Sequence, residues 1–213
     1  MNRKSTRETF NRSSYEGQSF TDIELKNSLV ESIEFIICTF DHCDFNETPF
    51  KACTFRDCIF ENCDLSLMQV DESVFKNTEF KSCKALGINW SKASWGRKEI
   101  TQLIKSIDFS KCVLNYSTFI GLELSHLNMQ DCIAHEVDFS EAILRKANFK
   151  GTDLQNAIFR SSDLREANFV GAKNYSISPQ LNKISRAKFS LPEAMSLMYN
   201  MDIVISESYE NDK

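Results

Sequence analysis

The sequence predicts an all-β solenoid, in which short strands and turns wind repeatedly around one axis. Three observations predict this fold class. Large apolar residues recur every five positions, a small residue stands two positions before most of them, and similar residues recur every 20 positions. A period of five fits neither the turn of an α-helix nor the two-residue alternation of a continuous strand. The repeat therefore decides the architecture.

The five-residue period runs through most of the chain in two phases. The first phase extends from Phe10 to Trp95, and the second extends from Phe109 to Phe169. Together they contain 16 of the 17 Phe residues, and only Phe189 lies outside them. Chance would place about one Phe in five on such a period, so the pattern indicates a structural repeat.

The small residue before each large one explains how a five-residue unit folds. Positions two apart lie on the same side of an extended segment, so both side chains point inward and the other residues turn the chain. Disulfides or a metal site would not follow the repeat, so we expect free, buried thiols in a reducing cytoplasm. All eight cysteines occupy this position: Cys38, Cys43, Cys53, Cys58, Cys63, Cys83, Cys112 and Cys132.

These units resemble the pentapeptide-repeat family, whose unit reads small, polar, Leu or Phe, polar, polar. CDFNE, CTFRD, CIFEN, ANFKG, AIFRS and ANFVG are matching units, and the resemblance covers about Phe10 to Asn174. It implies a right-handed quadrilateral β-helix with four pentapeptides per coil. Columns of like residues spaced 20 apart support four sides independently, as in Phe20, Phe40, Phe60 and Phe80. We expect about eight coils in a rod ~40 Å long.

The repeat is interrupted once and is followed by a C-terminal module. The phase change after Trp95 predicts a loop that leaves the coil, which is either a tolerated insertion or a partner contact. The charged residues of this loop are Arg97, Lys98, Glu99 and Lys105. The predicted segments are a disordered N-terminus (1–9), the first β-helix part (10–95), a loop or irregular coil (96–108), the second β-helix part (109–174), a capping and dimerisation module (175–205) and a disordered tail (206–213).

The C-terminal module contains a predicted α-helix that covers the open end of the solenoid. Ser190 and Glu193 have the spacing of a helix capping box, with Pro192 in the first turn. The apolar surface of this module exceeds what one end of the coil needs, and the resemblance implies head-to-head homodimers. The predicted dimer contacts are Leu191, Ala194, Met195, Met198, Met201, Ile203 and Ile205.

The sequence contains no motif for catalysis, and we expect a non-enzymatic protein without cofactor or metal. Nucleophile elbows, phosphate-binding loops and zinc-protease motifs are absent. His42, His126 and His135 fall on the outer turns, where we expect them to be solvated. A Phe-filled interior leaves no small-molecule pocket. Neither a membrane span nor a secretory signal is expected.

The distribution of charge suggests a protein partner. Net charge is −5 and the pI about 5.3, which argues against direct nucleic-acid binding. Residues 10–95 contain 14 acidic and 8 basic residues, whereas residues 96–174 contain 10 of each. Within the family, this chain resembles the bacterial Qnr-type quinolone-resistance proteins, but without their first, shorter loop, because the register is unbroken up to Trp95.

That resemblance implies binding to DNA gyrase or a related type II topoisomerase by mimicry of DNA, with protection against quinolones or peptide toxins. In this hypothesis the acidic coils meet the DNA channel and the loop after Trp95 makes a second contact. The alternative is a rigid scaffold that binds a different protein. The candidate acidic contacts are Asp22, Glu24, Asp41, Asp44, Glu61 and Asp64.

Overall fold

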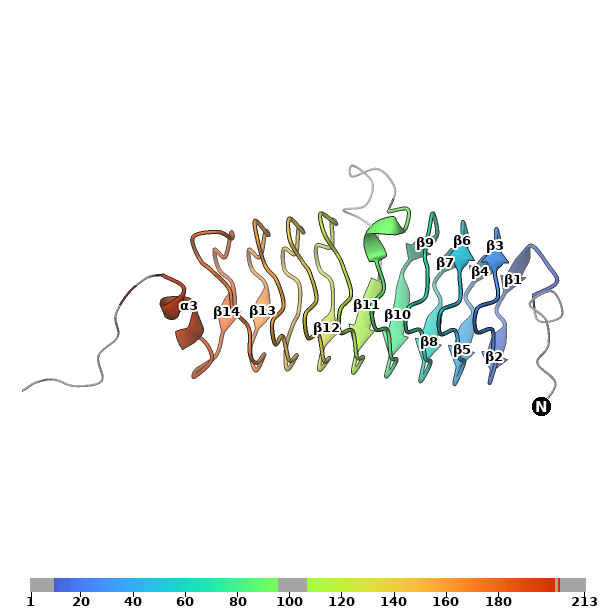
Figure 1. Cartoon of the computed structure of the whole chain (residues 1–213), viewed down its shortest axis with the longest axis horizontal. Coiled ribbons are helices and arrows are strands. Elements are labelled where there is room, and N and C mark those ends of the chain that lie inside the picture. The colour runs from blue at the N-terminus through green and yellow to red at the C-terminus, as the bar shows by residue number, and fades with distance from the viewer. Residues whose placement is uncertain (1–9, 96–106, 202, 204–213) are drawn as a thin grey trace, which may run out of the picture.

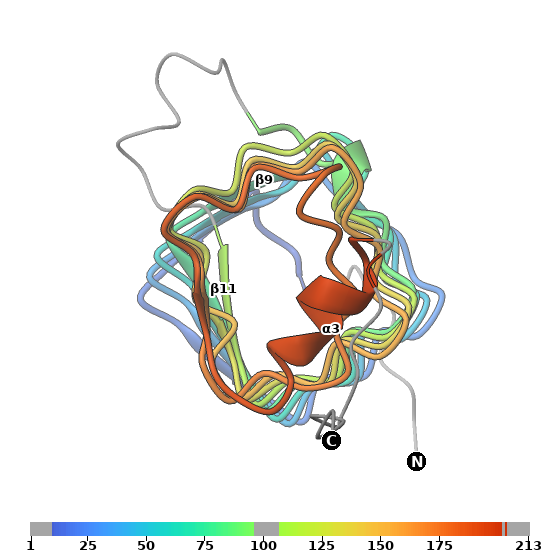
Figure 2. The ribbon, with the colours of Figure 1, turned by 90° about the vertical axis from the view of Figure 1, so that its left-hand side faces the viewer.

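The computed structural model describes residues 10–95, 107–201 and 203, which wind into a rod of short parallel strands (Figure 1). Seen along its axis, the coil has four sides (Figure 2). Strand partners come from successive coils, so that Phe20, Phe40 and Phe60 are neighbours in one sheet. The four-sided β-helix expected from the repeat is confirmed. The segments 1–9 and 206–213, for which disorder was predicted, lie outside the described residues.

We name the sides A to D in chain order. Side A contains a four-stranded sheet, and side B contains a six-stranded sheet and a later pair of strands. The strands of side A are β1 (Ser14–Glu16), β4 (Glu34–Ile36), β7 (Thr54–Arg56) and β9 (Val74–Lys76). Those of side B are β2 (Ser19–Thr21), β5 (Thr39–Asp41), β8 (Ile59–Glu61), β10 (Thr78–Lys81), β11 (Ile107–Ser110), β12 (Met129–Gln130), β13 (Asn168–Phe169) and β14 (Lys188–Phe189).

Sides C and D have less regular pairing. Side C consists of single parallel bridges between successive coils. Side D contains the paired strands β3 (Val30–Glu31) and β6 (Phe50–Lys51), and the short 3-10 helix η1 (Trp90–Lys92). Because every side repeats at the same register, outward side chains at equivalent positions form columns along the rod.

The core consists of stacked rings and small side chains. On side B, the ring of Phe60 lies 4.6 Å from that of Phe40 and 5.0 Å from that of Phe80, measured between ring centroids, and the rings are nearly parallel. Each ring therefore fills the space between its neighbours in the coils before and after it. All three are buried, so the inward phase of the repeat is confirmed.

The small inward position has a polar role that the sequence analysis did not predict. The Cys58 thiol donates to the carbonyl oxygen of Phe35 in the preceding coil at 3.4 Å, and the Ser73 hydroxyl donates to that of Phe50 at 2.8 Å. All eight cysteines are free and buried, as expected. Burial raises the pKa of Cys53 to about 11 and that of Cys58 to about 12, so both thiols stay protonated and unreactive.

The corners of the coil use left-handed backbone conformations. The residue two positions after most of the large inward residues has a positive φ, for example 53° at Asp22 and 57° at Asn27. Asn, Asp and Gly adopt this conformation at least cost, which explains why many corner residues are small or polar. Ile37, with φ of 53°, is the β-branched exception among the described corners.

The phase change after Trp95 corresponds to an insertion in one rung. Phe80 pairs with Phe60 at the ordinary spacing of one coil, and Phe109 pairs with Phe80 across a longer stretch of chain. The rung from Phe80 to Phe109 thus contains nine more residues than an ordinary rung, and the extra residues fall between Trp95 and Ile107. Residues 96–106, with the predicted contacts Arg97, Lys98, Glu99 and Lys105, lie outside the described part of the chain.

The β-helix continues beyond Asn174, where the repeat was expected to end. β14 pairs with β13, and the Phe189 ring stacks on that of Phe169 at 5.1 Å. Phe189 lies one full coil after Phe169 and is therefore in phase. The repeat is hidden here because the intervening positions Asn174 and Pro179 do not carry the large apolar residue of the motif.

The helix that covers the C-terminal end is shorter than predicted, and the capping box is absent. α3 spans Met195–Tyr199, and its N-cap, Ala194, makes no side-chain cap. The Ser190 hydroxyl instead accepts a hydrogen bond from the Gly171 N–H at 2.9 Å, which ties it to the previous coil. The helix lies across the end of the coil (Figure 2), and Leu197 packs against the core. Among the described residues, no helix is long and apolar enough to cross a membrane.

Candidate partner-binding surface

The six predicted acidic contacts lie together on the first coils, along the edge between sides B and C. Three of them form a column of parallel bridges on side C, Glu24 to Asp44 to Asp64. On side B, Asp41 of β5 lies opposite Glu61 of β8. We call this surface the acidic corner; it consists of Asp22, Glu24, Asp41, Asp44, Glu61 and Asp64.

Local contacts favour the charged form of one of these carboxylates. The Asn62 amide donates to Asp41 at 3.1 Å, and this bond, with the neighbouring His42, lowers the pKa of Asp41. His42 lies 2.8 Å from the same carboxylate, which raises the pKa of the imidazole. The corner is therefore anionic, with one titratable histidine at its edge.

The acidic corner ends at the fourth coil, where lysines follow the carboxylates in the same columns. Lys81 follows Glu61 in the side B column, and Lys84 follows Asp64 on side C, with its ammonium 3.9 Å from that carboxylate. Three coils at ~4.8 Å each give about 14 Å of axis, hence roughly one carboxylate per 2.4 Å. Duplex DNA carries one phosphate per about 1.7 Å. The corner thus has roughly seven-tenths of the axial charge density of DNA, over a short length.

Apolar side chains lie on side C and its edge with side D, beginning with Leu67 in the coil of Asp64 and continuing beyond the lysines. Val113 and Ile133 occupy the column that begins with Glu24. Leu67, Tyr116 and Ile133 expose 52%, 61% and 42% of their surface. We call Leu67, Val113, Tyr116 and Ile133 the apolar patch. A partner lying along side C would meet carboxylates first and apolar side chains next.

The C-terminal end exposes several of the predicted dimer contacts. Leu191 is 76% exposed, and Met198, Met201 and Ile203 are between 42% and 48% exposed. Ala194 and Met195 are partly buried. Ile205 lies outside the described residues. The end of the rod therefore presents apolar side chains that the described part of the chain does not cover.

Two of the three histidines have carboxylate partners. His42 and His126 are exposed, as expected, although His42 also pairs with Asp41. His135 is partly buried, with its Nε2 3.1 Å from Asp153. The expectation of a freely solvated side chain was therefore wrong for His135, because the next coil brings a carboxylate beside it. The described residues contain no cluster of side chains that could hold a metal ion.

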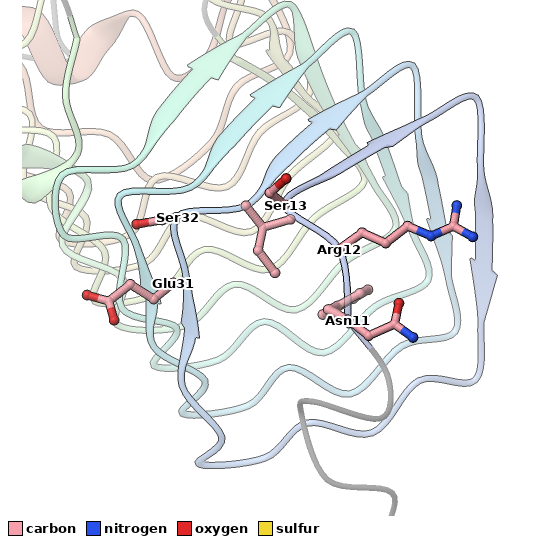
Figure 3. A pocket seen from close by; sticks show the side chains of 7 residues that line it. Asn11, Arg12, Ser13, Glu31 and Ser32 are labelled. Atoms are coloured by element: carbon pink, nitrogen blue, oxygen red, sulfur yellow. The ribbon is translucent and has the colours of Figure 1, made fainter.

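A hollow of about 480 Å³ lies at the N-terminal end of the coil. Beside it, the backbone N–H of Arg12 donates to the Tyr15 hydroxyl at 3.1 Å. Figure 3 shows the side chains of Arg12 and Glu31 pointing in different directions, so they form no acid–base pair. The lining residues are Phe10, Asn11, Arg12, Ser13, Glu31, Ser32 and Ile33.

Comparison with known proteins identifies the repeat. The family model of the pentapeptide repeat region matches residues 33–104 and 101–169. QnrB1, a plasmid-mediated fluoroquinolone resistance protein, is similar in structure, with a TM-score of 0.63 and 16% sequence identity over 89% of this chain and 100% of that chain. No curated protein sequence matches the chain.

A second solved structure covers a similar length. HetL, a pentapeptide repeat protein involved in heterocyst differentiation regulation from the cyanobacterium Nostoc sp. strain PCC 7120, matches 86% of this chain and 92% of its own, with 17% identity and a TM-score of 0.47. At the identity found for QnrB1 the likeness shows the fold alone. The repeat model covers more than half of the sequence, and the same period organises the core. This chain belongs to the pentapeptide-repeat family.

Proposed function

We propose that this protein is a non-enzymatic interaction protein that binds DNA gyrase or a related type II topoisomerase through the acidic corner. The observation that carries this proposal is the convergence of six carboxylates on one edge of the β-helix, at roughly seven-tenths of the axial charge density of DNA. A DNA channel is lined with cations that such an edge can meet without rearrangement. In the proposal the protein occupies the channel in place of DNA.

The fold and its relatives support this choice of partner. One protein of this fold, QnrB1, is a fluoroquinolone resistance protein, and quinolones act on type II topoisomerases. Protection against such drugs or against peptide toxins is the proposed biological outcome. The backbone that carries the acidic corner is held by the hydrogen bonds of the β-helix, so binding need not order the main chain.

We propose further that two copies associate through their C-terminal ends. The exposed side chains of Leu191, Met198 and Met201 lie on and beside the helix α3, which covers the end of the coil. Burying them against a second copy removes apolar surface from water. The acidic corners then lie at the two outer ends of the dimer, each free to meet a cationic surface.

A supercoiling assay with purified gyrase tests the proposed partner. The expected result is inhibition that weakens as salt rises, or restored activity in the presence of ciprofloxacin, because an electrostatic contact is screened by salt. Absence of both effects at micromolar protein contradicts the proposal.

Light scattering tests the proposed dimer. The double substitution Leu191→Asp with Met198→Asp is expected to give a folded monomer, because both side chains are exposed in the single chain. The control is Ile158→Asp, an exposed apolar residue on side D, which should leave the mass unchanged. A wild-type mass equal to that of one chain contradicts the dimer.

A second candidate function, a scaffold for a different protein, is favoured by the apolar patch. Mimicry of the charge of DNA does not require the exposed side chains of Tyr116 and Ile133. A protein interface commonly combines an aromatic anchor with apolar neighbours. The substitution Tyr116→Ala separates the two functions. Gyrase inhibition is expected to be unaffected by this change if the acidic corner carries the binding.

A further inference from the structure

The charge of the second half of the chain is divided sharply along the rod. Residues 107–142 contain six acidic residues and one basic residue, whereas residues 143–190 contain three acidic and nine basic residues. When the charges of residues 96–174 are summed, the acidic and the basic region cancel. The last coils are therefore strongly cationic, although the protein as a whole carries a net charge of −5.

Most of these cations lie on two adjoining sides of the coil. Residues 143–150, 163–170 and 183–190 form successive rungs on sides A and B, and they contain seven basic and two acidic residues. The stretches between them contain only Asp153, Arg160 and Lys173 as charged residues. We call the surface on sides A and B the basic corner; it consists of Arg145, Lys146, Lys150, Arg165, Lys183, Arg186 and Lys188.

A buried carboxylate positions two of the guanidinium groups. The Asp163 side chain is 8% exposed, and its Oδ2 accepts from Arg145 Nε at 2.7 Å and from Arg165 Nη2 at 2.6 Å. Arg165 Nε also donates to Asp163 Oδ1 at 2.8 Å. Two positive charges thus share one negative charge, and both guanidinium groups keep outward edges, since Arg145 is 48% and Arg165 40% exposed. The arrangement is preorganised for an anion.

The shape of the basic corner matches a groove of duplex nucleic acid. Lys146 and Arg186 lie on the convex turn between sides A and B, with Glu166 between them in the same column. Arg145 comes before the turn and Lys150 after it. Five residues of extended chain span at most ~16 Å, and the turn shortens this distance. The major groove of B-DNA is about 12 Å wide, so cations on either side of the turn can reach the phosphates of both strands.

The basic corner lacks the exposed aromatic side chains that bind single-stranded nucleic acid. Single-stranded nucleic acid is held by bases that stack on exposed aromatic rings. Among the described residues, the exposed aromatic side chains are Tyr116 and Tyr199, and neither belongs to the basic corner. Contacts to phosphate without stacking favour a duplex backbone bound without sequence preference.

We infer that the basic corner binds the phosphate backbone of duplex nucleic acid. This surface lies on other coils than the acidic corner and is independent of the proposed topoisomerase contact. It revises the expectation of no direct nucleic-acid contact, because that expectation used the charge of the whole chain and the contact depends on the charge of one face.

Fluorescence anisotropy with a labelled duplex of about 20 base pairs tests this inference through the salt dependence of binding. The triple substitution Lys146→Glu, Lys150→Glu and Arg186→Glu is expected to weaken binding more than tenfold and to reduce the slope of log K against log salt by about three. The control, Lys26→Glu, Arg160→Glu and Lys173→Glu, changes net charge equally on sides C and D and should retain the slope.

Three outcomes overturn the inference. Equal loss in both triple variants means that net charge, and not the basic corner, governs association. Poly-glutamate that competes as well as duplex of equal charge means that the corner takes an acidic protein segment. A single strand of the same length should bind more weakly than the duplex, and tighter binding of the single strand contradicts the backbone geometry.

Discussion

The first coils and the last coils build the same four-sided rung from different side chains. The coil that begins at Phe35 places phenylalanine on all four sides, whereas the coil that begins at Phe139 alternates phenylalanine with leucine. Cysteine and threonine fill most of the small positions of the earlier coil, and alanine and threonine fill most of those in the later one. Burial is nearly complete in both. The backbone therefore requires one large and one small inward residue per side, and it tolerates wide variation in their chemistry.

The outer surfaces of the same regions differ more. The acidic corner gathers carboxylates between sides B and C of the first coils, whereas the basic corner gathers cations on sides A and B of the last ones. Core positions are constrained by stacking, but outward positions are free to vary from rung to rung. We therefore expect partner binding to depend on the outward columns.

The largest expected effect is the loss of a stacked ring. Phe60→Ala should lower the free energy of unfolding by about 3–5 kcal/mol, because it leaves a cavity between the rings of Phe40 and Phe80. Leu144→Ala, in the later coils, should cost about 2–5 kcal/mol. Urea unfolding monitored by circular dichroism measures both. Wild-type stability in either variant contradicts the inward register of that half.

A smaller effect is expected at the ion pairs of the last coils. Hydrogen bonds from Arg165, and then from Arg145, lower the pKa of Asp163. A depressed carboxyl pKa stabilises the fold above the unfolded value of about 3.9, and this contribution is lost as pH falls from that value through the folded pKa. Asp163→Asn should therefore lower stability by about 1–3 kcal/mol at pH 7.

The pH dependence distinguishes this mechanism from a simple packing defect. The stability difference between wild type and Asp163→Asn should shrink as the pH is lowered from about 5 to about 2, because the carboxyl becomes protonated in the unfolded wild-type chain while the lowered pKa keeps it ionised in the folded chain. A difference that stays constant over that range means that the arginines do not carry the effect. Thermal unfolding at a series of pH values provides the comparison.

The smallest effect concerns a corner of the first coils. Ile37 has a φ of 53° and is 58% exposed, so its β-branched side chain strains the backbone without packing in the core. Ile37→Asn should raise stability by about 1 kcal/mol. The reverse change, Asn27→Ile at a φ of 57°, should lower it by a similar amount. Changes of opposite sign in the free energy of unfolding, measured with urea, support a preference for Asn over Ile at these corners. Changes of the same sign contradict it.

The sequence predicted most of the fold because the repeat is visible in one dimension. The phase of Phe40 and Cys58 determines which side chains are buried, and the four-pentapeptide step determines the columns. The continuation to Phe189 was missed because Pro179 and Asn174 obscure the motif, although Phe189 itself is in phase with Phe169. The capping box at Ser190 failed because a serine hydroxyl can serve a neighbouring coil as well as a helix.

The surfaces were less predictable than the core. The acidic corner was found because its residues recur at the same place in successive coils. The basic corner was missed because a count along the chain averages four sides that point in different directions. The contact of Asp163 with Arg145 joins residues from two successive coils and depends on their stacking. When the sequence is written with one coil per row, the residues of each outward column stand one below the other.

Gyrase supercoiling in the presence of two charge-matched variants tests the role of the acidic corner most directly. The first variant carries Glu24→Gln, Asp44→Asn and Asp64→Asn, and the second carries Glu136→Gln, Asp138→Asn and Glu141→Gln in the middle coils. Both remove three negative charges, so they differ only in position. We expect the first variant to need about tenfold more protein for half-maximal inhibition and the second to match wild type. Equal inhibition by the two variants would contradict the acidic corner as the binding surface.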